Sequence, residues 1–477
     1  MARIETDYLV VGAGAIGMAF VDVLLERTDA DIVIVDKRCQ PGGHWVDGYP
    51  FLRLHQPSAF YGVPSCPLGM DRVDTDGVNA GFYERAGVAE INDYYQKVMQ
   101  DRFLASDRVR FLPSTEYLAV DQGEHSLRGT LSGTEIRVKA RRKLVDATYL
   151  QSSIPATHDP KQNRVGFTCD PDVRMVTPGE LVNCFDCPDG FTLIGAGKTA
   201  MDTCCWLIDA GVDPNRIRWI RPRDGWLVNR VTTQPLDLSA NMLIFQGHMM
   251  AAAATSGDGY ELACRMEEQE LYLRIDTQQR APIYRGATIA LSELEALRTV
   301  ENVVRKGYIQ SVDTRRVRLT EGELKHTTDH VFIDCTAPGL ANKPLVPIFR
   351  DDKIIIQYTT VGVAPWTAAV VGFFESLDIS TEDKNACCAP LPRTGLIEDQ
   401  PVNMHRGFAL EGPRRKYSEY ADWSSACRLN AGRSIAEHMA DPEVGDAVAL
   451  MSKHGAAAMK NLARMAAARD NNLGSES

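Results

Sequence analysis

The chain has 477 residues, of which 44% are hydrophobic and 24% are charged. This composition is typical of a globular protein with roughly two to four domains, and it excludes a collagen-like or disordered chain. The 52 basic and 63 acidic side chains give a formal net charge of −11, which disfavours a nucleic-acid partner because such binding depends on clustered lysines and arginines. Twelve cysteines are too few for a disulfide scaffold, and no apolar run is long enough to span a membrane. We therefore expect a cytoplasmic protein without a membrane partner.

The first 36 residues predict a strand, a glycine turn, a helix and a second strand. Apolar runs at 7–11 and 32–35 favour strands, and the spacing of apolar residues over 18–27 favours a helix. The turn has the G-x-G-x-x-G spacing that permits a tight bend, close approach to a pyrophosphate and close helix–strand packing. An acid follows the second strand, where a carboxylate accepts hydrogen bonds from ribose hydroxyls. The predicted dinucleotide site consists of Gly12, Gly14, Ala15, Ile16, Gly17, Asp36 and Lys37.

The same pattern returns about 180 residues later, with strands predicted at 191–194 and 217–220 and a helix at 201–210. No acid follows the second strand of this unit; Arg221 and Arg223 stand there instead. A guanidinium suits a 2′-phosphate, so this unit favours NADPH over NADH, unless the two arginines are only a solvated surface pair. The predicted site consists of Gly195, Gly197, Lys198, Thr199, Ala200, Arg221 and Arg223.

Two different dinucleotide sites in one chain are explained most simply by a flavin that receives hydride from NADPH. The sequence therefore predicts an α/β fold with two Rossmann-like dinucleotide-binding domains, the second inserted in the first. Strand-like runs at 143–148 and 330–339 are the expected crossings between them. We place the two parts of the FAD-binding domain at 1–150 and 335–477, and the NADPH-binding domain at 151–334. A helical insertion at about 241–274 is either a cover over a substrate pocket or, more simply, a packing layer. The helical pattern at 431–469 favours packing or homo-oligomer contact.

Several further motifs resemble those of the flavin-containing (class B) monooxygenases. Gln40-Pro-Gly-Gly-His-Trp45 is similar to the Gly-Gly-x-Trp element of that family, and the segment 49–57 to its Tyr-Pro and Asn-x-Pro segment near the flavin. Asp146-Ala-Thr148 and the run 334–339 resemble its two Ala-Thr-Gly-like crossings. The family's Phe-x-Gly-x-x-x-His fingerprint is absent, and 154–160 stands in its place. The resemblance adds Gly43, His44, Trp45 and Thr148 to the predicted cofactor-binding residues.

The resemblance implies an enzyme with FAD and NADPH as cofactors and with O2 and a small organic molecule as substrates. NADPH would reduce the flavin, oxygen would add at its C4a position, and one oxygen atom would reach a nitrogen, a sulfur or, in Baeyer–Villiger fashion, a ketone. His55 stands where the family has asparagine, with Gln56 beside it. We predict both as catalytic residues, since an imidazole there can hydrogen-bond a peroxide oxygen or move a proton. The alternative is that His55 only satisfies a backbone group.

The pair Cys184 and Cys187 supports a rival hypothesis, an NADPH-dependent flavin or disulfide reductase. Only seven residues separate Cys187 from Gly195, which is short for a mobile redox loop. A non-catalytic redox sensor that binds both dinucleotides is a third hypothesis. No group of residues has metal-ligand spacing, so no metal is expected.

Overall fold

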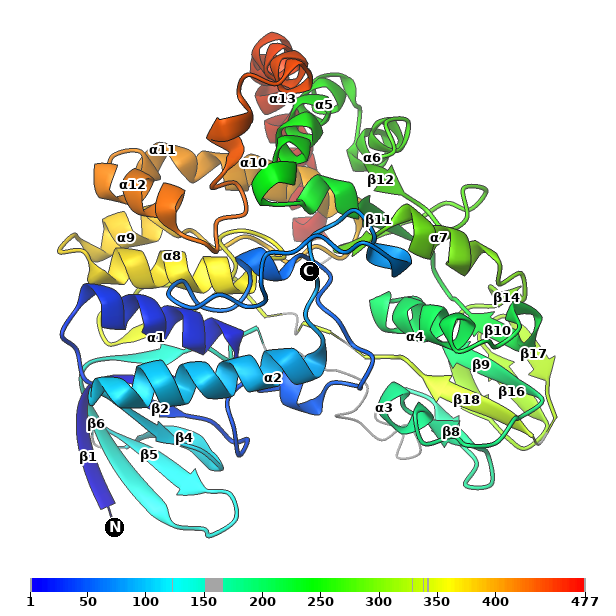
Figure 1. The fold of residues 1–477 in the computed structure, drawn as a ribbon, viewed down its shortest axis with the longest axis horizontal. Coiled ribbons are helices and arrows are strands. Elements are labelled where there is room, and N and C mark those ends of the chain that lie inside the picture. Colours follow the sequence, from blue (N-terminus) through cyan, green and yellow to red (C-terminus); the bar gives the residue numbers. More distant parts are fainter. Residues whose placement is uncertain are drawn as a thin grey trace.

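The computed structural model describes residues 2–121, 123–150, 166–327, 329–337, 339–340 and 343–475. Figure 1 shows two strand-rich parts, at the lower left and the lower right, with a helical part above them. Within the described residues, no helix is both long and apolar enough to cross a membrane.

The first strand-rich part is a seven-stranded sheet in the order β3-β2-β1-β6-β5-β4, with β19 paired to β6. The strands that flank β1, together with β3 and β19, run parallel, whereas β4 and β5 form an antiparallel meander with β6. The members are β1 (Ala2–Val11), β2 (Ile32–Val35), β3 (Val109–Leu112), β4 (Thr115–Asp121), β5 (Glu124–Gly129), β6 (Glu135–Asp146) and β19 (Lys353–Ile355).

Helix α1 (Ala15–Arg27) covers this sheet and packs against α8 (Ala364–Ser376). The contact is close because Gly372 of α8 has no side chain; a Cβ there would lie 3.1 Å from the carbonyl oxygen of Phe20. Both helices are apolar on almost every side, as expected for helices enclosed by other elements. Helices α2 (Val88–Lys97) and α12 (Ser418–Ala426) add side chains to the same core, and α9 (Thr381–Cys387) and α11 (Glu411–Arg414) follow nearby.

The second strand-rich part is built around a parallel sheet in the order β14-β10-β9-β18-β8. Its buried central strand β9 leads directly into α4, as the sequence predicted. These elements are β8 (Met175–Val176), α3 (Pro178–Leu181), β9 (Gly190–Ile194), α4 (Lys198–Asp209), β10 (Ile217–Ile220), α7 (Leu291–Arg298), β14 (Val303–Val304) and β18 (His330–Asp334). Two small sheets flank it, made of β11 (Gly225–Asn229), β12 (Tyr272–Leu273) and β13 (Ile283–Ile289), and of β7 (Thr168–Cys169), β15 (Ile309–Val312), β16 (Arg316–Leu319) and β17 (Gly322–Lys325).

The strands of the second sheet come, along the chain, between two groups of strands that belong to the first. After β18 completes the second sheet, β19 pairs with β6 of the first. The domain boundaries predicted at 150/151 and 334/335 stay predictions, because 151–165 lie outside the described residues.

The helical part joins the 241–274 region to the end of the chain. The structure has the expected helices there, α5 (Ala240–Thr255) and α6 (Gly259–Glu267), and α13 (Pro442–Ser475) lies along α5. Met249, Met250 and Leu262 share one apolar core with Leu462 and Met465 of α13, beside α10 (Gln400–Ala409). The apolar faces of the 241–274 region and of α13 are therefore buried against each other. Within the predicted second part of the FAD-binding domain, α10 and α13 thus pack on this layer, whereas α8 and α12 belong to the core of the first part.

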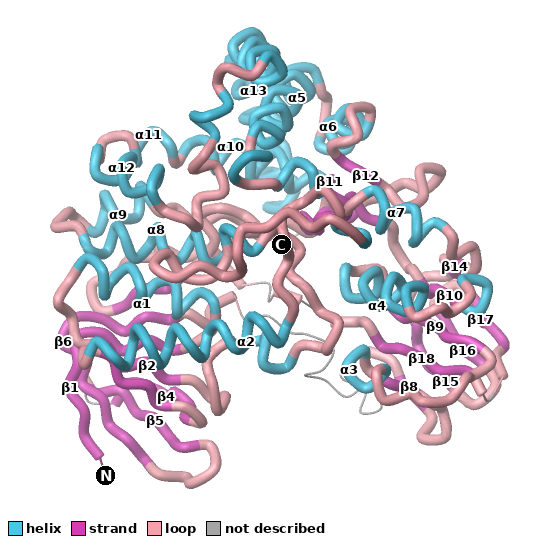
Figure 2. Tube along the Cα trace, viewed as in Figure 1, coloured by secondary structure: helices cyan, strands magenta, loops and turns pink. Residues whose placement is uncertain are grey.

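A long segment between β2 and α2, residues 36–87, contains only short 3₁₀ turns among its helical elements. Figure 2 shows loops in the centre of the molecule, between the two strand-rich parts. This segment carries His55 and meets the second part of the molecule.

Candidate cofactor sites and active site

The first glycine turn has the geometry of a pyrophosphate-binding turn. Gly12 has a φ of 106°, which favours glycine, and a Cβ on Gly17 would overlap the carbonyl oxygen of Gly12. Helix α1 starts after Gly14 with no side-chain cap and no acid in its first turn. The backbone N–H groups at Ala15 and Ile16 therefore stand at a positive helix end that suits a phosphate.

A second glycine loop lies directly against this turn. A Cβ on Gly43 would lie 2.9 Å from the Cα of Gly14, and Gly42 N–H donates to the carbonyl oxygen of Ala13 at 2.9 Å. Next to it, the Trp45 indole N–H donates to the Tyr61 hydroxyl at 2.7 Å, and the Trp45 ring is buried as a wall. Burial lowers the pKa of neighbouring His44 to about 4, so this ring is neutral near pH 7.

Asp36 lies where the sequence predicted it, at the end of β2 and beside the glycine turn. Its Oδ2 accepts a hydrogen bond from Ala13 N–H at 2.7 Å, and its Oδ1 accepts one from Arg38 N–H at 2.9 Å. These bonds fix the carboxylate and leave each oxygen a further lone pair for a ribose hydroxyl. Lys37 is exposed beside it.

The second glycine turn repeats the local plan with more open space. Gly195 has a φ of 125°, and its carbonyl oxygen accepts a hydrogen bond from the Trp219 indole N–H at 2.7 Å. Helix α4 starts after Gly197 without a side-chain cap, and a Cβ on Gly197 would meet no atom within 4 Å. Thr199 is half-buried in the first turn of α4, and Ala200 is fully buried.

The two crossings between the parts are also equivalent. Asp146 Oδ1 accepts hydrogen bonds from the N–H and hydroxyl of Thr148, and Asp334 Oδ1 does the same for Thr336. Thr148 lies over Gly12, and Thr336 lies over Gly195. The predicted cofactor residue Thr148 is therefore next to the first turn. Pro338 of the second crossing and the 154–160 segment lie outside the described residues.

Arg221 does not have the surroundings that the sequence predicted. Its side chain is only 2% exposed, pairs with Asp224 at 2.8 Å and lies over the Trp219 ring. It is therefore not presented to solvent for a 2′-phosphate. Arg223 is exposed, with its guanidinium 5.5 Å from the centre of the Tyr308 ring. Burial and the positive charges of Arg393 and Arg223 lower the pKa of Arg285, which places three arginines near one another.

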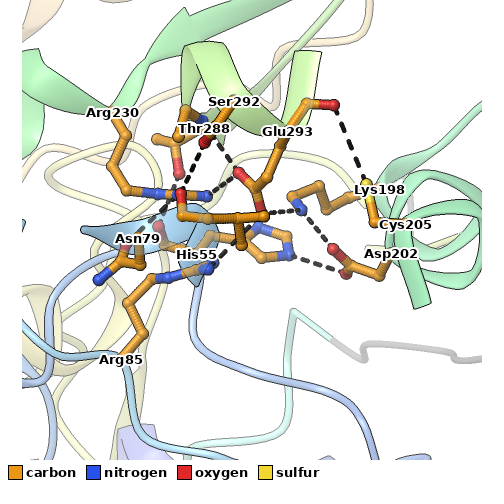
Figure 3. A network of polar contacts seen from close by, with 12 residues as sticks. His55, Asn79, Arg85, Lys198, Asp202, Cys205, Arg230, Thr288, Ser292 and Glu293 are labelled. Carbon is orange, nitrogen blue, oxygen red and sulfur yellow. Dashed lines mark hydrogen bonds and ion pairs between the residues drawn. The ribbon is translucent and has the colours of Figure 1, made fainter. Parts of the chain in front are cut away.

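A network of charged side chains surrounds His55 at the junction of the two strand-rich parts (Figure 3). His55 Nε2 lies 4.0 Å from Asp202 Oδ2, and the Tyr49 hydroxyl donates to the same oxygen at 3.1 Å. Asp202 also pairs with Lys198, whose Nζ lies 3.9 Å from Glu293 Oε1. Asp202 therefore links the histidine to helix α4, which follows the second glycine turn.

The centre of the network is Glu293 of α7. It pairs with Arg230, which is fully buried, and lies 3.5 Å from Arg85. Burial alone would raise the pKa of Glu293, but Lys198, Arg230 and Arg85 lower it to about 2. Around Glu293, Arg230 donates to Asn79, Ser292 donates to the Val78 carbonyl oxygen and Thr288 donates to the His55 carbonyl oxygen. These bonds fasten the 49–87 segment to the second part of the molecule.

The charge state of His55 follows from these neighbours. Desolvation lowers its pKa to about 4, helped by the positive charges of Lys198, Arg85 and Arg230, while Asp202 opposes the shift. The ring is 40% exposed, so a ligand can reach it, and it is neutral near pH 7. Gln56 is half-buried beside it.

Lys198 was predicted to add positive charge near the phosphates at the helix start, and this stays a prediction. In the structure its Nζ pairs with Asp202 inside the network. Asp202, Glu293, Arg85 and Arg230 were missed by the sequence reasoning. Only Asp202 had a local signal, because it stands four residues after Lys198 on the same helix face.

Comparison with protein-family models finds no match. Two uncharacterized proteins, from Mycobacterium tuberculosis and Mycobacterium bovis, are each 39% identical to the chain over 430 residues, which cover 90% of this chain and 78% of theirs. The chain belongs to their family.

Comparison of this chain with solved structures shows its fold. An oxidized steroid monooxygenase bound to NADP superposes with a TM-score of 0.51 at 14% identity, covering 78% of this chain and 85% of that one. A polycyclic ketone monooxygenase from the fungus Thermothelomyces thermophila gives a TM-score of 0.50 at 13% identity, covering 97% and 90%. The chain therefore has the fold of the class B flavoprotein monooxygenases, and the predicted α/β class is confirmed.

The cysteine pair and the second glycine turn lie at opposite ends of strand β9. Cys184 and Cys187 are free thiols before the amino end of β9, whereas Gly195 follows its carboxyl end. A five-residue strand spans about 15 Å. Cys187 is exposed, and its Sγ lies 3.3 Å from an Arg216 nitrogen.

Proposed function

We propose that the protein is an FAD- and NADPH-dependent monooxygenase. The observation that carries this proposal is that each of the two parts has a glycine turn followed by a helix without a side-chain cap. The two parts meet at His55, whose ring a ligand can reach. The fold likeness supports the same reaction class.

The residues present fit both dinucleotides. Gly12, Gly14 and the first turn of α1 would hold the FAD pyrophosphate, and Asp36 would accept hydrogen bonds from the ribose. The open space at Gly197 and the uncapped start of α4 fit the NADPH pyrophosphate. When bound, FAD supplies acceptance of hydride and activation of O2.

The coenzyme 2′-phosphate is assigned to Arg223 rather than Arg221. Arg223 is exposed at the end of β10 and has Arg285 nearby, so a doubly charged phosphate would relieve repulsion between these guanidiniums. Arg221 has a positioning role, because its ion pair with Asp224 holds the turn that carries Arg223.

His55 is proposed to act at the junction, where its imidazole is neutral near pH 7 in the absence of coenzyme. Its ring nitrogens can donate or accept a hydrogen bond, so it can hold a proton for a reacting oxygen. The pairs of Glu293 with Arg230 and Arg85, close to this ring in the same network, are themselves buried. The proposed substrate is a small organic molecule that is oxygenated at nitrogen, at sulfur or at a ketone.

The position of Cys184 and Cys187 argues against a disulfide reductase. Both thiols precede the amino end of β9, whereas the glycine turn follows its carboxyl end, so flavin-derived electrons would have to cross the length of this strand to reach them. The pair is therefore given no part in the proposed reaction.

The test starts with anaerobic addition of NADPH to the purified protein, followed by rapid mixing with oxygen. We expect a yellow protein that bleaches with NADPH and then regains its oxidised spectrum only after a delay, with little hydrogen peroxide released. Immediate return with stoichiometric peroxide, in the presence of a panel of amines, sulfides and ketones, would favour a reductase. A protein that neither contains nor takes up FAD would refute the proposal.

A further inference from the structure

The network around His55 contains more positive than negative charge. Lys198, Arg85 and Arg230 face the ring region from α4, from the segment before α2 and from the turn after β11, whereas only Asp202 and Glu293 oppose them. Tyr49 contributes a neutral hydroxyl to Asp202. The excess is one positive charge in a largely buried cluster, and the Nε atoms of Arg85 and Arg230 have no hydrogen-bond partner there.

Lys198 connects this cluster to the coenzyme side of the molecule. It is the first residue of α4 and the only cationic side chain in that helix. Its backbone belongs to the uncapped helix start, while its ammonium pairs with Asp202 one turn further on. A phosphate at the helix start therefore lies within the electrostatic reach of an ammonium whose charge, after burial, contributes most to lowering the pKa of His55.

We propose that Lys198 links the coenzyme site to His55, so that an anionic dinucleotide at the start of α4 makes His55 take up a proton. The inference rests on the proposed placement of NADPH at this helix. The dinucleotide phosphates offset the excess positive charge, and Asp202 then becomes the dominant neighbour of the ring. His55 thereby gains its proton only when the coenzyme is present, which confines proton donation to the loaded enzyme.

The linkage has a definite sign and size. His55 starts with a pKa of about 4, so it holds almost no proton at pH 6 without coenzyme. Coenzyme offsets the positive charges but not the burial of the ring, so the ordinary value of about 6.5 is the upper limit, at which binding takes up roughly three quarters of a proton at pH 6. By reciprocity, NADP+ binds more tightly at pH 5.5 than at pH 7.5, by up to about tenfold at that limit.

The experiment is calorimetry of NADP+ binding to the FAD-loaded protein in buffers with different heats of ionisation, which counts the protons exchanged. We expect the wild type to take up more protons than His55→Gln, a difference that cancels protons exchanged by the nucleotide itself. Nuclear magnetic resonance of ring-labelled histidine should show the His55 signal titrating at higher pH with NADP+ than without it.

The variants separate the linkage from a structural role. In Lys198→Met, His55 should titrate at a higher pH than in the wild type even without NADP+, and the proton uptake should shrink; Lys198→Arg should behave as the wild type. Lys97→Met removes an exposed lysine from a similar pair with Asp93, and should leave the uptake unchanged. If NADP+ binds with equal proton uptake in wild type and His55→Gln, the linkage is wrong and the proposed function stands. If NADP+ does not bind at all, both are overturned.

Discussion

The two glycine turns share one sequence pattern but differ in what surrounds them. At the first turn, Gly14 lies against Gly43, and Gly17 lies against the carbonyl of Gly12. At the second, Gly197 faces open space, and the residue matching Gly17 is Ala200. The first turn is thus closely packed against backbone atoms, whereas the second has open space beside the start of its helix. This difference suits a flavin that stays bound at the first turn and a coenzyme that binds and dissociates at the second.

The largest expected effect comes from adding one methyl group to each turn by a glycine-to-alanine substitution, which tests whether the two turns are packed differently. Gly17→Ala should prevent normal folding and flavin binding, at a cost of at least about 3 kcal/mol, because its Cβ would overlap fixed backbone. Gly197→Ala should change stability by less than about 1 kcal/mol while weakening NADPH binding. Chemical denaturation and flavin content would measure both. Equal stability losses would show that the turns do not differ as described.

The junction between the parts is tested by removing its central charge. Glu293→Gln leaves Arg230 and Arg85 without their carboxylate, which should lower the free energy of unfolding by about 3–5 kcal/mol. Glu295→Gln, at an exposed position on the same helix, is the matched control and should change it by less than about 0.5 kcal/mol. Urea denaturation distinguishes the two. A small effect at Glu293 would mean that the network contributes little to joining the parts.

Acidification should destabilise the protein in two steps. The pKa values of His44, His55 and His330 are lowered to about 4 in the fold, so below pH 6.5 the unfolded chain binds protons that the folded chain does not. Stability should therefore rise with pH between about 4 and 6.5. Glu293 contributes stability above pH 4.5 that is lost as the pH falls towards its folded value of about 2. Thermal unfolding from pH 3 to 8 would measure this. A flat profile from pH 4 to 6.5 would contradict the histidine assignment.

The arginines after β10 should separate into a binding and a structural role. Arg223→Ala should raise the KM for NADPH about tenfold or more and spare NADH, because a charge-assisted phosphate contact is lost. Arg221→Ala should instead lower the melting temperature, since it leaves buried Asp224 with one cation fewer. Steady-state kinetics with both coenzymes, beside melting curves, would check this. Loss of NADPH preference in Arg221→Ala alone would restore the original prediction.

The smallest effect is expected at the cysteine pair. Replacing Cys184 and Cys187 with serine should change NADPH consumption by less than about twofold, since the pair lies at the end of β9 away from the glycine turn. Loss of turnover in the double variant would revive the disulfide reductase hypothesis.

The sequence by itself determined both strand–turn–helix units, the position of Asp36 and the α/β class. These features depend on local spacing, since a turn of fixed length between an apolar strand and a helix leaves few alternatives. Even the two Asp-x-Thr crossings were found from the sequence, and the structure places their threonines over Gly12 and Gly195.

Only the tertiary structure decided how the charged side chains are used. Arg221 is buried by Asp224 and Trp219, and Lys198 turns away from the helix start towards Asp202 and Glu293. The network that holds His55 joins residues up to 233 positions apart in the sequence, and their meeting depends on how two packed parts fit together. No local periodicity encodes that fit, because a charged residue in sequence looks the same whether it faces water, a phosphate or a buried partner.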